Sequence, residues 1–459
     1  MTLHDGRSLV RAAGRVLGVL CLLLAALPRP ARAASLLADR LELTMYGRMG
    51  VAWTPTSGRF IQGKTLNLTG TPIGGRLEEG DYLEPTIRLH LLEPNPDPAA
   101  PSVDLVLTPS MFSSGGLFAG VFSDRFTDSL SIQLFQAYVE ARNVGLANLK
   151  VWGGARLYRG TDVHIADLYY FNNLSGQGGG VGLGKWEAAI ILQTSATSPQ
   201  YNFDADGDGT LDLRRERTVF VAQYNREAKE GHLLQGLAEL HLLPAARVKR
   251  EDGTEVGFNA DWGWALGIKG RLDLGNGGFN ELSVRYGSRA ASGSRAGSQT
   301  WDAFGAANVL GRYDDAAGLQ VVDHVLYNFN SRFSLNGYGI LHYNRGLDDT
   351  GEDDASLDFA LGARGTVYVV DYFHLLGEAT YQGLRPRGRE LATAVKLSLI
   401  PTYVPVKDRT VWARPHFRVF YTIAFYDRAA VDNLYSPYLQ TVGPTRVGHY
   451  LGARVEWFF

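Results

Sequence analysis

Alternation of apolar and polar side chains recurs along most of the chain from residue 41 onward, and no other feature constrains the fold as strongly. In the segment 41–53, Leu43 and Val51 lie on one face, whereas Glu42 and Arg48 lie on the other. A period of two residues is that of a β-strand with two different neighbours. The pattern returns in the segments 82–91, 149–158, 185–194, 217–225, 234–242, 261–273, 279–289, 333–344, 356–367, 372–382, 391–400 and 411–425 and at the C-terminal end, 450–459. The sequence therefore predicts an all-β fold.

The length and polarity of these segments favour a transmembrane antiparallel β-barrel over a soluble β-sandwich. Many segments have about ten residues, the length that a tilted strand needs to cross a bilayer. The apolar faces end in aromatic residues, as the girdles of membrane barrels do, at Trp53, Trp262, Trp457 and Phe459. A sandwich also alternates, but it turns its polar face to bulk water.

The first 33 residues resemble a secretory signal peptide. Arginines precede a short apolar run over Leu17–Leu27, and Ala31-Arg-Ala33 offers a cleavage site. We expect cleavage after Ala33, loss of the lone Cys21 with the peptide, and a single barrel domain over 34–459. The formal net charge of the whole chain is −2. This balance gives no basic surface for nucleic acid, and no later stretch has the ~20 apolar residues of a spanning helix.

Connections between the predicted strands alternate between short and long. Asn276–Gly278 is a tight turn, whereas 195–216, 290–318 and 426–446 are rich in Gly, Ser and Asp and fit external loops. The glycine-rich stretch 175–184 lacks the strand-then-helix context of a phosphate-binding loop and is predicted to be a flexible loop tip. No G-x-S-x-G elbow is present, so the sequence does not indicate an enzyme.

An acidic stretch, 204–212, has the spacing of a calcium loop. Four aspartates occupy positions 1, 3, 5 and 9 of such a loop, and a glycine occupies position 6; the aspartates are Asp204, Asp206, Asp208 and Asp212. Arg215 stands at position 12, where a bidentate carboxylate is expected. A structural calcium ion and a solvated acidic loop both remain open, and no other cofactor is implied.

Five aromatic residues break the alternation, because they lie on the polar faces of their segments. They are Tyr46, Tyr82, Phe279, Trp412 and Phe458. A single such ring fills space in a lumen, but five together suggest a lane for sugars. Aromatic planes stack on the apolar face of a sugar ring, and neighbouring Arg and Glu side chains hydrogen-bond its hydroxyls. Weak binding at many points also suits conduction through a channel.

Several stretches are similar to the maltoporin family of carbohydrate porins. The most specific is VWGGARLYRGTDVHIADLYYFNNLSG (151–176), and 45–53, 412–427 and the terminal aromatic pair also resemble the family. The resemblance implies a homotrimer of about eighteen-stranded barrels in the outer membrane of a Gram-negative bacterium. Each barrel would have long external loops, with the third folded into its lumen.

The resemblance also implies roles for individual residues. The five aromatic residues match the family's "greasy slide", and a sixth ring would come from a neighbouring subunit, at Phe122 or Phe126. The polar track at the constriction is matched by Arg48, Arg76, Glu84, Asp167 and Tyr169. Three positions depart: one family arginine falls on Phe135 or Gln136, another on Gly160 beside Arg159, and an aspartate becomes Asn172.

These observations predict passive, facilitated diffusion of maltodextrin-like oligosaccharides, with the membrane and two further copies of the chain as partners. The alternative is a general or ion-selective porin, which would carry charge ladders without an aromatic lane. An energy-coupled transporter would need an N-terminal plug, and the first predicted strand begins about ten residues after the cleavage site.

Overall fold

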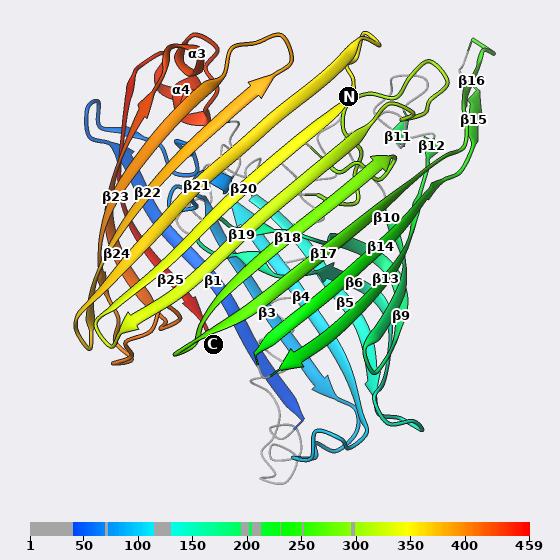
Figure 1. The fold of residues 1–459 in the computed structure, drawn as a ribbon, viewed down its shortest axis with the longest axis horizontal. Helices are drawn as coiled ribbons and strands as arrows, with labels where there is room; N and C mark the ends of the chain where they lie inside the picture. The colour runs from blue at the N-terminus through cyan, green and yellow to red at the C-terminus, as the bar shows by residue number, and fades with distance from the viewer. Residues whose placement is uncertain are drawn as a thin grey trace, which may run out of the picture.

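The computed structural model describes residues 40–68, 72–113, 130–193, 202–203, 213–229, 231–249, 252–294 and 299–459, and it forms a closed antiparallel barrel of 18 strands (Figure 1). The strands are β1 (Leu41–Thr54), β3 (Asp81–His90), β4 (Ser102–Ser113), β5 (Leu130–Arg142), β6 (Leu149–Arg159), β9 (Asn173–Leu183), β10 (Trp186–Gln193), β13 (Arg217–Lys229), β14 (His232–Leu243), β17 (Asp261–Gly275), β18 (Gly278–Arg289), β19 (Ala317–Asn330), β20 (Phe333–Leu347), β21 (Asp353–Val370), β22 (Phe373–Pro386), β23 (Ala392–Tyr403), β24 (His416–Tyr426) and β25 (Val447–Phe458). Each strand pairs with the next, and β25 pairs with β1 to close the sheet.

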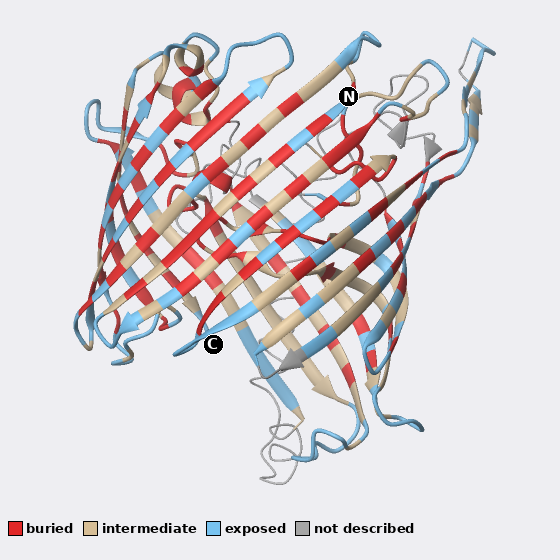
Figure 2. Cartoon of the chain, in the orientation of Figure 1, coloured by how far each residue is buried: buried red, intermediate tan, exposed pale blue. Residues whose placement is uncertain are grey.

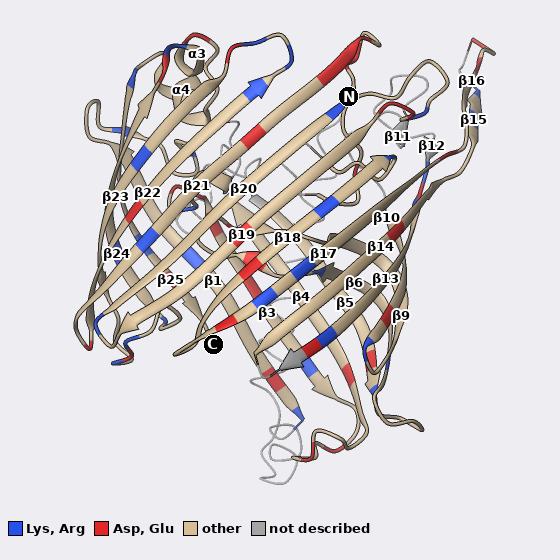
Figure 3. Ribbon diagram, in the orientation of Figure 1, with Lys and Arg blue, Asp and Glu red and all other residues tan. Residues whose placement is uncertain are grey.

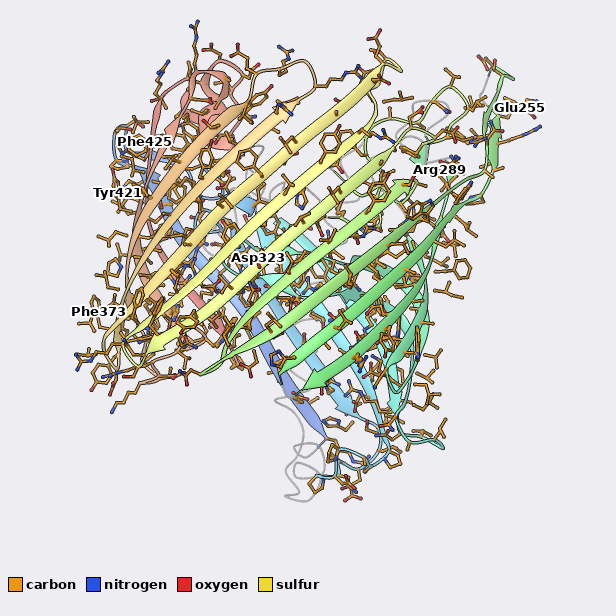
Figure 4. The ribbon with its side chains drawn as sticks, viewed as in Figure 1. Glu255, Arg289, Asp323, Phe373, Tyr421 and Phe425 are labelled. Carbon is orange, nitrogen blue, oxygen red and sulfur yellow. The ribbon has the colours of Figure 1, made fainter. Side chains whose placement is uncertain are left out.

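Burial alternates along the strands as the sequence pattern predicts (Figure 2). In β24 the polar residues Arg418 and Thr422 are buried inside the barrel, whereas Val419 and Tyr421, which alternate with them, are exposed on the outside. Tyr421 and Phe425 project from the outer side of this strand (Figure 4). The apolar faces therefore form the outer surface, and the polar faces line the lumen.

Two predictions about individual segments are wrong. The glycine-rich stretch 175–184 is not a loop tip, because all but its last residue belong to strand β9. A Cβ atom on Gly178 would lie 2.0 Å from the Ile190 carbonyl oxygen of β10, so the close approach of this strand requires glycine. The segment 411–425 is not one strand either. β24 begins at His416, directly after Pro415, whose nitrogen carries no hydrogen for a ladder.

Short turns lie at one rim of the barrel, together with the start of β1 and the end of β25. The opposite rim carries longer connections, including the β15–β16 hairpin (Ala246–Lys249 and Glu255–Phe258) and two short helices, α3 (Arg428–Asp432) and α4 (Pro437–Val442) (Figure 1). No helix in the described part of the chain is long and apolar enough to cross a membrane. The predicted signal peptide, 1–33, lies outside the described residues.

Two connections from the rim of long loops fold into the lumen. The connection 160–172, between β6 and β9, contains the small strands β7 (Asp162–Val163) and β8 (Leu168–Tyr169). It reaches the opposite wall, where the Phe171 backbone N–H donates to Gln320. This agrees with the predicted inward third loop.

The described parts of the first connection, 55–68 and 72–80, fold inward as well, which the sequence did not indicate. It includes β2 (Arg59–Phe60) and a 3-10 turn, η2 (Pro72–Gly74). The Ile73 carbonyl oxygen accepts a hydrogen bond from the Tyr338 hydroxyl of β20. Glu78 forms an ion pair with Lys396 of β23 at 2.8 Å, and both side chains are almost fully buried. This buried pair fastens the connection to the wall.

We predict that Glu78→Gln destabilises the barrel by about 3 kcal/mol, because it leaves a buried ammonium group without an opposite charge. Glu255→Gln is the matched control. Glu255 pairs with Arg247 at 3.8 Å on the exposed β15–β16 hairpin, labelled in Figure 4. The control should change stability by no more than about 0.5 kcal/mol. Urea unfolding in detergent micelles measures both variants, and equal midpoints would contradict the assigned role of Glu78.

Candidate functional site

The interior of the barrel is polar and carries compensated charges. Acidic and basic positions on the strands are few and separated by long uncharged stretches (Figure 3). Several of those facing inward are less than 10% exposed, among them Arg48, Arg364, Arg418, Arg454 and Glu456. Buried charges persist when they are paired or hydrogen-bonded, so this interior is organised by ion pairs.

Three of the five inward aromatic residues are neighbours on adjoining strands. The ring centroids of Tyr46 on β1 and Tyr82 on β3 lie 5.8 Å apart. Phe458 on β25 is the register partner of Tyr46 across the seam that closes the barrel. Guanidinium groups cover two of these rings, since Arg48 lies 5.2 Å from the centroid of Tyr82 and Arg76 lies 5.8 Å from that of Tyr46. These three residues therefore occupy neighbouring inward positions on β3, β1 and β25, and together they are called the aromatic patch.

Trp412 extends this patch from a connection and not from a strand. Its ring centroid lies 6.4 Å from that of His164, which belongs to the inward connection 160–172. Arg414 follows two residues later, and its guanidinium lies 5.2 Å from the centroid of Phe458. Trp412 and Phe458 are both more than 40% exposed.

Phe279 faces the lumen from β18, far around the wall from the other four rings in strand order. It is 5% exposed. The Arg271 guanidinium lies 4.2 Å from its centroid, and the edge of His324 approaches at 5.0 Å. Phe279 therefore stands apart from the patch and is covered by Arg271 and His324.

The polar residues predicted for the constriction meet between the two inward connections. Arg48 forms ion pairs with Glu79 at 3.1 Å and with Asp167 at 3.6 Å. Arg76 contacts the same two carboxylates, at 3.2 and 3.7 Å, and donates to the Tyr46 hydroxyl at 2.6 Å. Two arginines and two carboxylates thus bind the connections 55–80 and 160–172 to each other beside the aromatic patch.

Asp167 lies in the connection 160–172 and holds a backbone φ of +49°. Burial raises the pKa of its carboxyl, but the guanidinium groups of Arg76 and Arg48 outweigh burial and lower that pKa to about 2. Asp167 is therefore ionised at neutral pH, and its charge is matched by the two arginines.

The remaining predicted constriction residues form a second group. The guanidinium of Arg159 lies 3.9 Å from the ring centroid of Tyr169 and 3.9 Å from a Glu84 carboxylate oxygen. Glu84 also accepts a hydrogen bond from the Tyr82 hydroxyl. Asn172 is buried, and its backbone carbonyl oxygen accepts a hydrogen bond from the Gly160 backbone N–H at 2.9 Å. These contacts join the aromatic patch to the base of the inward connection.

Sequence reasoning missed His164, which links Arg76 in the first group to Glu456 on β25 and to Arg414. His164 approaches Glu456 at 3.1 Å, Arg414 at 3.2 Å and the Arg76 side chain at 3.3 Å. Its only sequence signal was its place within the family-like stretch 151–176. Glu79 was also missed, although it lies three residues after Arg76.

Some predicted positions lie outside the described residues: the aspartates Asp204, Asp206, Asp208 and Asp212, and the aromatic candidates Phe122 and Phe126. Of the two positions aligned with a family arginine, Gln136 donates to Thr108 on β4 at 3.1 Å. Among the residues that the structure describes, no group of three or more acidic, histidine or cysteine side chains is arranged to hold a metal ion.

An 18-stranded closed barrel with an apolar exterior, a polar lumen and inward connections defines a porin channel of the Gram-negative outer membrane. The comparison with family models identifies it further. Residues 41–458 match the model of the LamB porin family, and the chain belongs to this family. It is accordingly a channel and not an enzyme.

Individual proteins that resemble this chain share 25% or less of its sequence over the matched residues. Maltoporin 1 of Klebsiella pneumoniae is 25% identical over 240 residues, which cover 51% of this chain and 53% of that protein. The match therefore spans about half the length of this relative. OccAB1 of Acinetobacter baumannii has a TM-score of 0.46 at 9% identity, covering 92% of this chain and 96% of that structure. An anion-selective porin from Comamonas acidovorans has a TM-score of 0.40 at 12% identity, covering 91% of this chain and 100% of that structure.

We predict that Glu456→Gln shifts the channel toward anion selectivity. The Glu456 carboxylate compensates Arg418 at 2.6 Å and Arg414 at 3.6 Å, so its neutral isostere leaves two cations partly unmatched. Reversal potentials in a KCl gradient across a planar bilayer measure the change. Glu352→Gln is the control, because it removes the same charge from an exposed connection. It should shift the reversal potential several times less than Glu456→Gln does. Equal shifts of the reversal potential would contradict a position of Glu456 at the constriction.

Proposed function

We propose that this porin carries oligosaccharides by passive, facilitated diffusion, with the inward aromatic residues as its binding lane. The observation that supports this most is the aromatic patch of Tyr82, Tyr46 and Phe458 on three adjoining strands. A sugar ring that stacks on them would keep its hydroxyl rim free for polar partners.

The polar partners are placed for such a role. The hydroxyls of Tyr46 and Tyr82 already lie in hydrogen bonds with Arg76 and Glu84, respectively. Arginine offers several donors in a planar fork, and a carboxylate offers acceptors, so together they can exchange hydrogen bonds with sugar hydroxyls. Each hydrogen bond between the sugar and the protein replaces a hydrogen bond between the sugar and water. Sugar binding therefore stays weak at every step, as conduction requires.

The exposed rings Trp412 and Phe458 would continue the lane past His164. Phe279 would be the last ring, and its cover by Arg271 means that the guanidinium must move before a sugar can stack there. We further propose cleavage of the signal peptide after Ala33 and assembly as a homotrimer in the outer membrane.

We predict that Trp412→Ala weakens block by maltohexaose about fivefold, the loss of one stacking contact of about 1 kcal/mol. Single-channel current in a planar bilayer, measured while the sugar is titrated, gives the affinity. Ion conductance should change little, because the indole ring of Trp412 carries no charge.

Trp186→Ala is the matched control, since that ring is 64% exposed on the outer face of β10. The control should bind maltohexaose as the unaltered protein does. Equal block in both variants would show that Trp412 only fills space. A current indifferent to every oligosaccharide would instead support a general, ion-selective porin.

A further inference from the structure

A polar cavity of about 470 Å³ lies in the lumen behind the inward connection 160–172. Its walls come from β6, β10, β13, β14, β17 and β18, and Arg159, Thr161 and Phe171 border it from the connection side. Lys150, Asn225 and Leu233 place it toward the rim of short turns, because they lie close to those turns on their strands. The cavity is large enough for about two sugar rings.

Cations outnumber carboxylates around this cavity. Five cationic side chains line it, Lys150, Arg156, Arg159, Lys269 and Arg271, whereas Glu187 and Glu281 are the carboxylates among its described lining residues. Glu281 is shared by Lys269 at 3.4 Å and Arg271 at 3.9 Å. The lining therefore keeps a net positive charge.

Three of the cationic groups are more exposed to the lumen than either carboxylate of the lining. The side chains of Arg271, Lys150 and Arg159 are 39%, 28% and 26% exposed. Glu187 is 16% exposed and Glu281 only 1%. Outside the lining, Glu140 pairs with both Arg142 and Arg156 and is 2% exposed, and Glu84 pairs with Arg159 at 3.9 Å. The five cationic side chains of the lining still outnumber these two carboxylates together with Glu187 and Glu281. A solute in the cavity consequently meets ammonium and guanidinium groups before carboxylates.

The surplus of positive charge does not extend into the next cavity toward the short-turn rim. A neighbouring cavity of about 330 Å³, nearer the short-turn rim, is lined by Glu227 and Asp273 as well as Arg271 and Phe279. The surplus of positive charge is thus confined to the space between Phe279 and the inward connection. A narrow lumen with low-dielectric walls strengthens the field of such a local surplus.

We propose that this cavity binds the anionic group of an acidic sugar, so that the channel favours oligosaccharides carrying carboxylate, phosphate or sulfate groups over neutral ones. This inference rests on the proposed sugar-binding function and deepens it. The rings of the aromatic patch bind any sugar, whereas the cationic lining selects among them. Rings of Arg and Lys select anions in other pores by the same physics.

The test compares two α-1,4-linked trisaccharides, neutral maltotriose and trigalacturonate, as blockers of the full-length channel in planar bilayers. At 0.1 M KCl trigalacturonate should bind about tenfold tighter, and raising KCl to 1 M should remove most of that advantage by screening. A phosphorylated maltotriose in the same assay separates a preference for phosphate from one for carboxylate, and a gain over maltotriose with either supports the proposal.

Charge variants test the location. Lys150→Gln should weaken trigalacturonate binding about threefold, and Glu187→Gln should strengthen it by a similar factor, while maltotriose binding stays constant. Lys185→Gln is the matched control, because Lys185 lies exposed in the turn between β9 and β10. Ion conductance shows that each variant has assembled.

Three results would contradict the proposal, and they can be told apart. If maltotriose blocks the channel and neither acidic sugar binds tighter, the channel binds sugars without selecting anions. If none of the three sugars blocks, the proposed sugar-binding function fails, and this inference fails with it. Equal effects of Lys150→Gln and Lys185→Gln would exclude this cavity as the origin of a preference for acidic sugars.

Discussion

The closure of β25 onto β1 is the constraint on which the rest of the structure depends. In a bilayer every backbone N–H and C=O group must find a partner within the protein, and a sheet satisfies this only when it has no free edge. The closing seam pairs Tyr46 with Phe458 and Arg48 with Glu456. The interaction that completes the barrel therefore also assembles the aromatic patch and its charged neighbours.

A closed barrel of this size would leave a wide lumen, and the two inward connections fill much of it. They are held by buried ion pairs: Glu78 with Lys396 at the wall, and Arg48 and Arg76 with Glu79 and Asp167 between the connections. Because each arginine contacts two carboxylates, the two connections position each other. The two positive charges of Arg48 and Arg76 are thus matched by the two negative charges of Glu79 and Asp167.

The cavity behind the connection 160–172 differs from this region in its charge. Between the two connections Arg48 and Arg76 are matched by Glu79 and Asp167, whereas the cavity lined by Lys150 and Arg271 keeps a positive surplus. One lumen would then combine two kinds of selection. Aromatic planes and balanced charges act on the shape and hydroxyls of a sugar, and the cationic lining acts on its charge.

The barrel architecture and many of the residues that line the lumen could be predicted from the sequence alone. Alternation fixes which residues face lipid and which face the lumen, because a period of two admits one assignment once one face must be apolar. The same alternation identified Tyr46, Tyr82 and Phe458 as inward rings, since each interrupts a polar face. It misread 175–184, since glycine carries no side chain to alternate, and it could not show that Pro415 delays the start of β24.

Which of these residues contact one another is visible only in the tertiary structure. Alternation gives a direction for each side chain and no distance between strands far apart in the chain. The inward course of 55–80, the joining of Arg76 to Asp167, the part played by His164 and the covering of Phe279 by Arg271 all depend on contacts between distant segments. Local pattern cannot encode such contacts, because they arise when the barrel closes and brings its connections into one confined space.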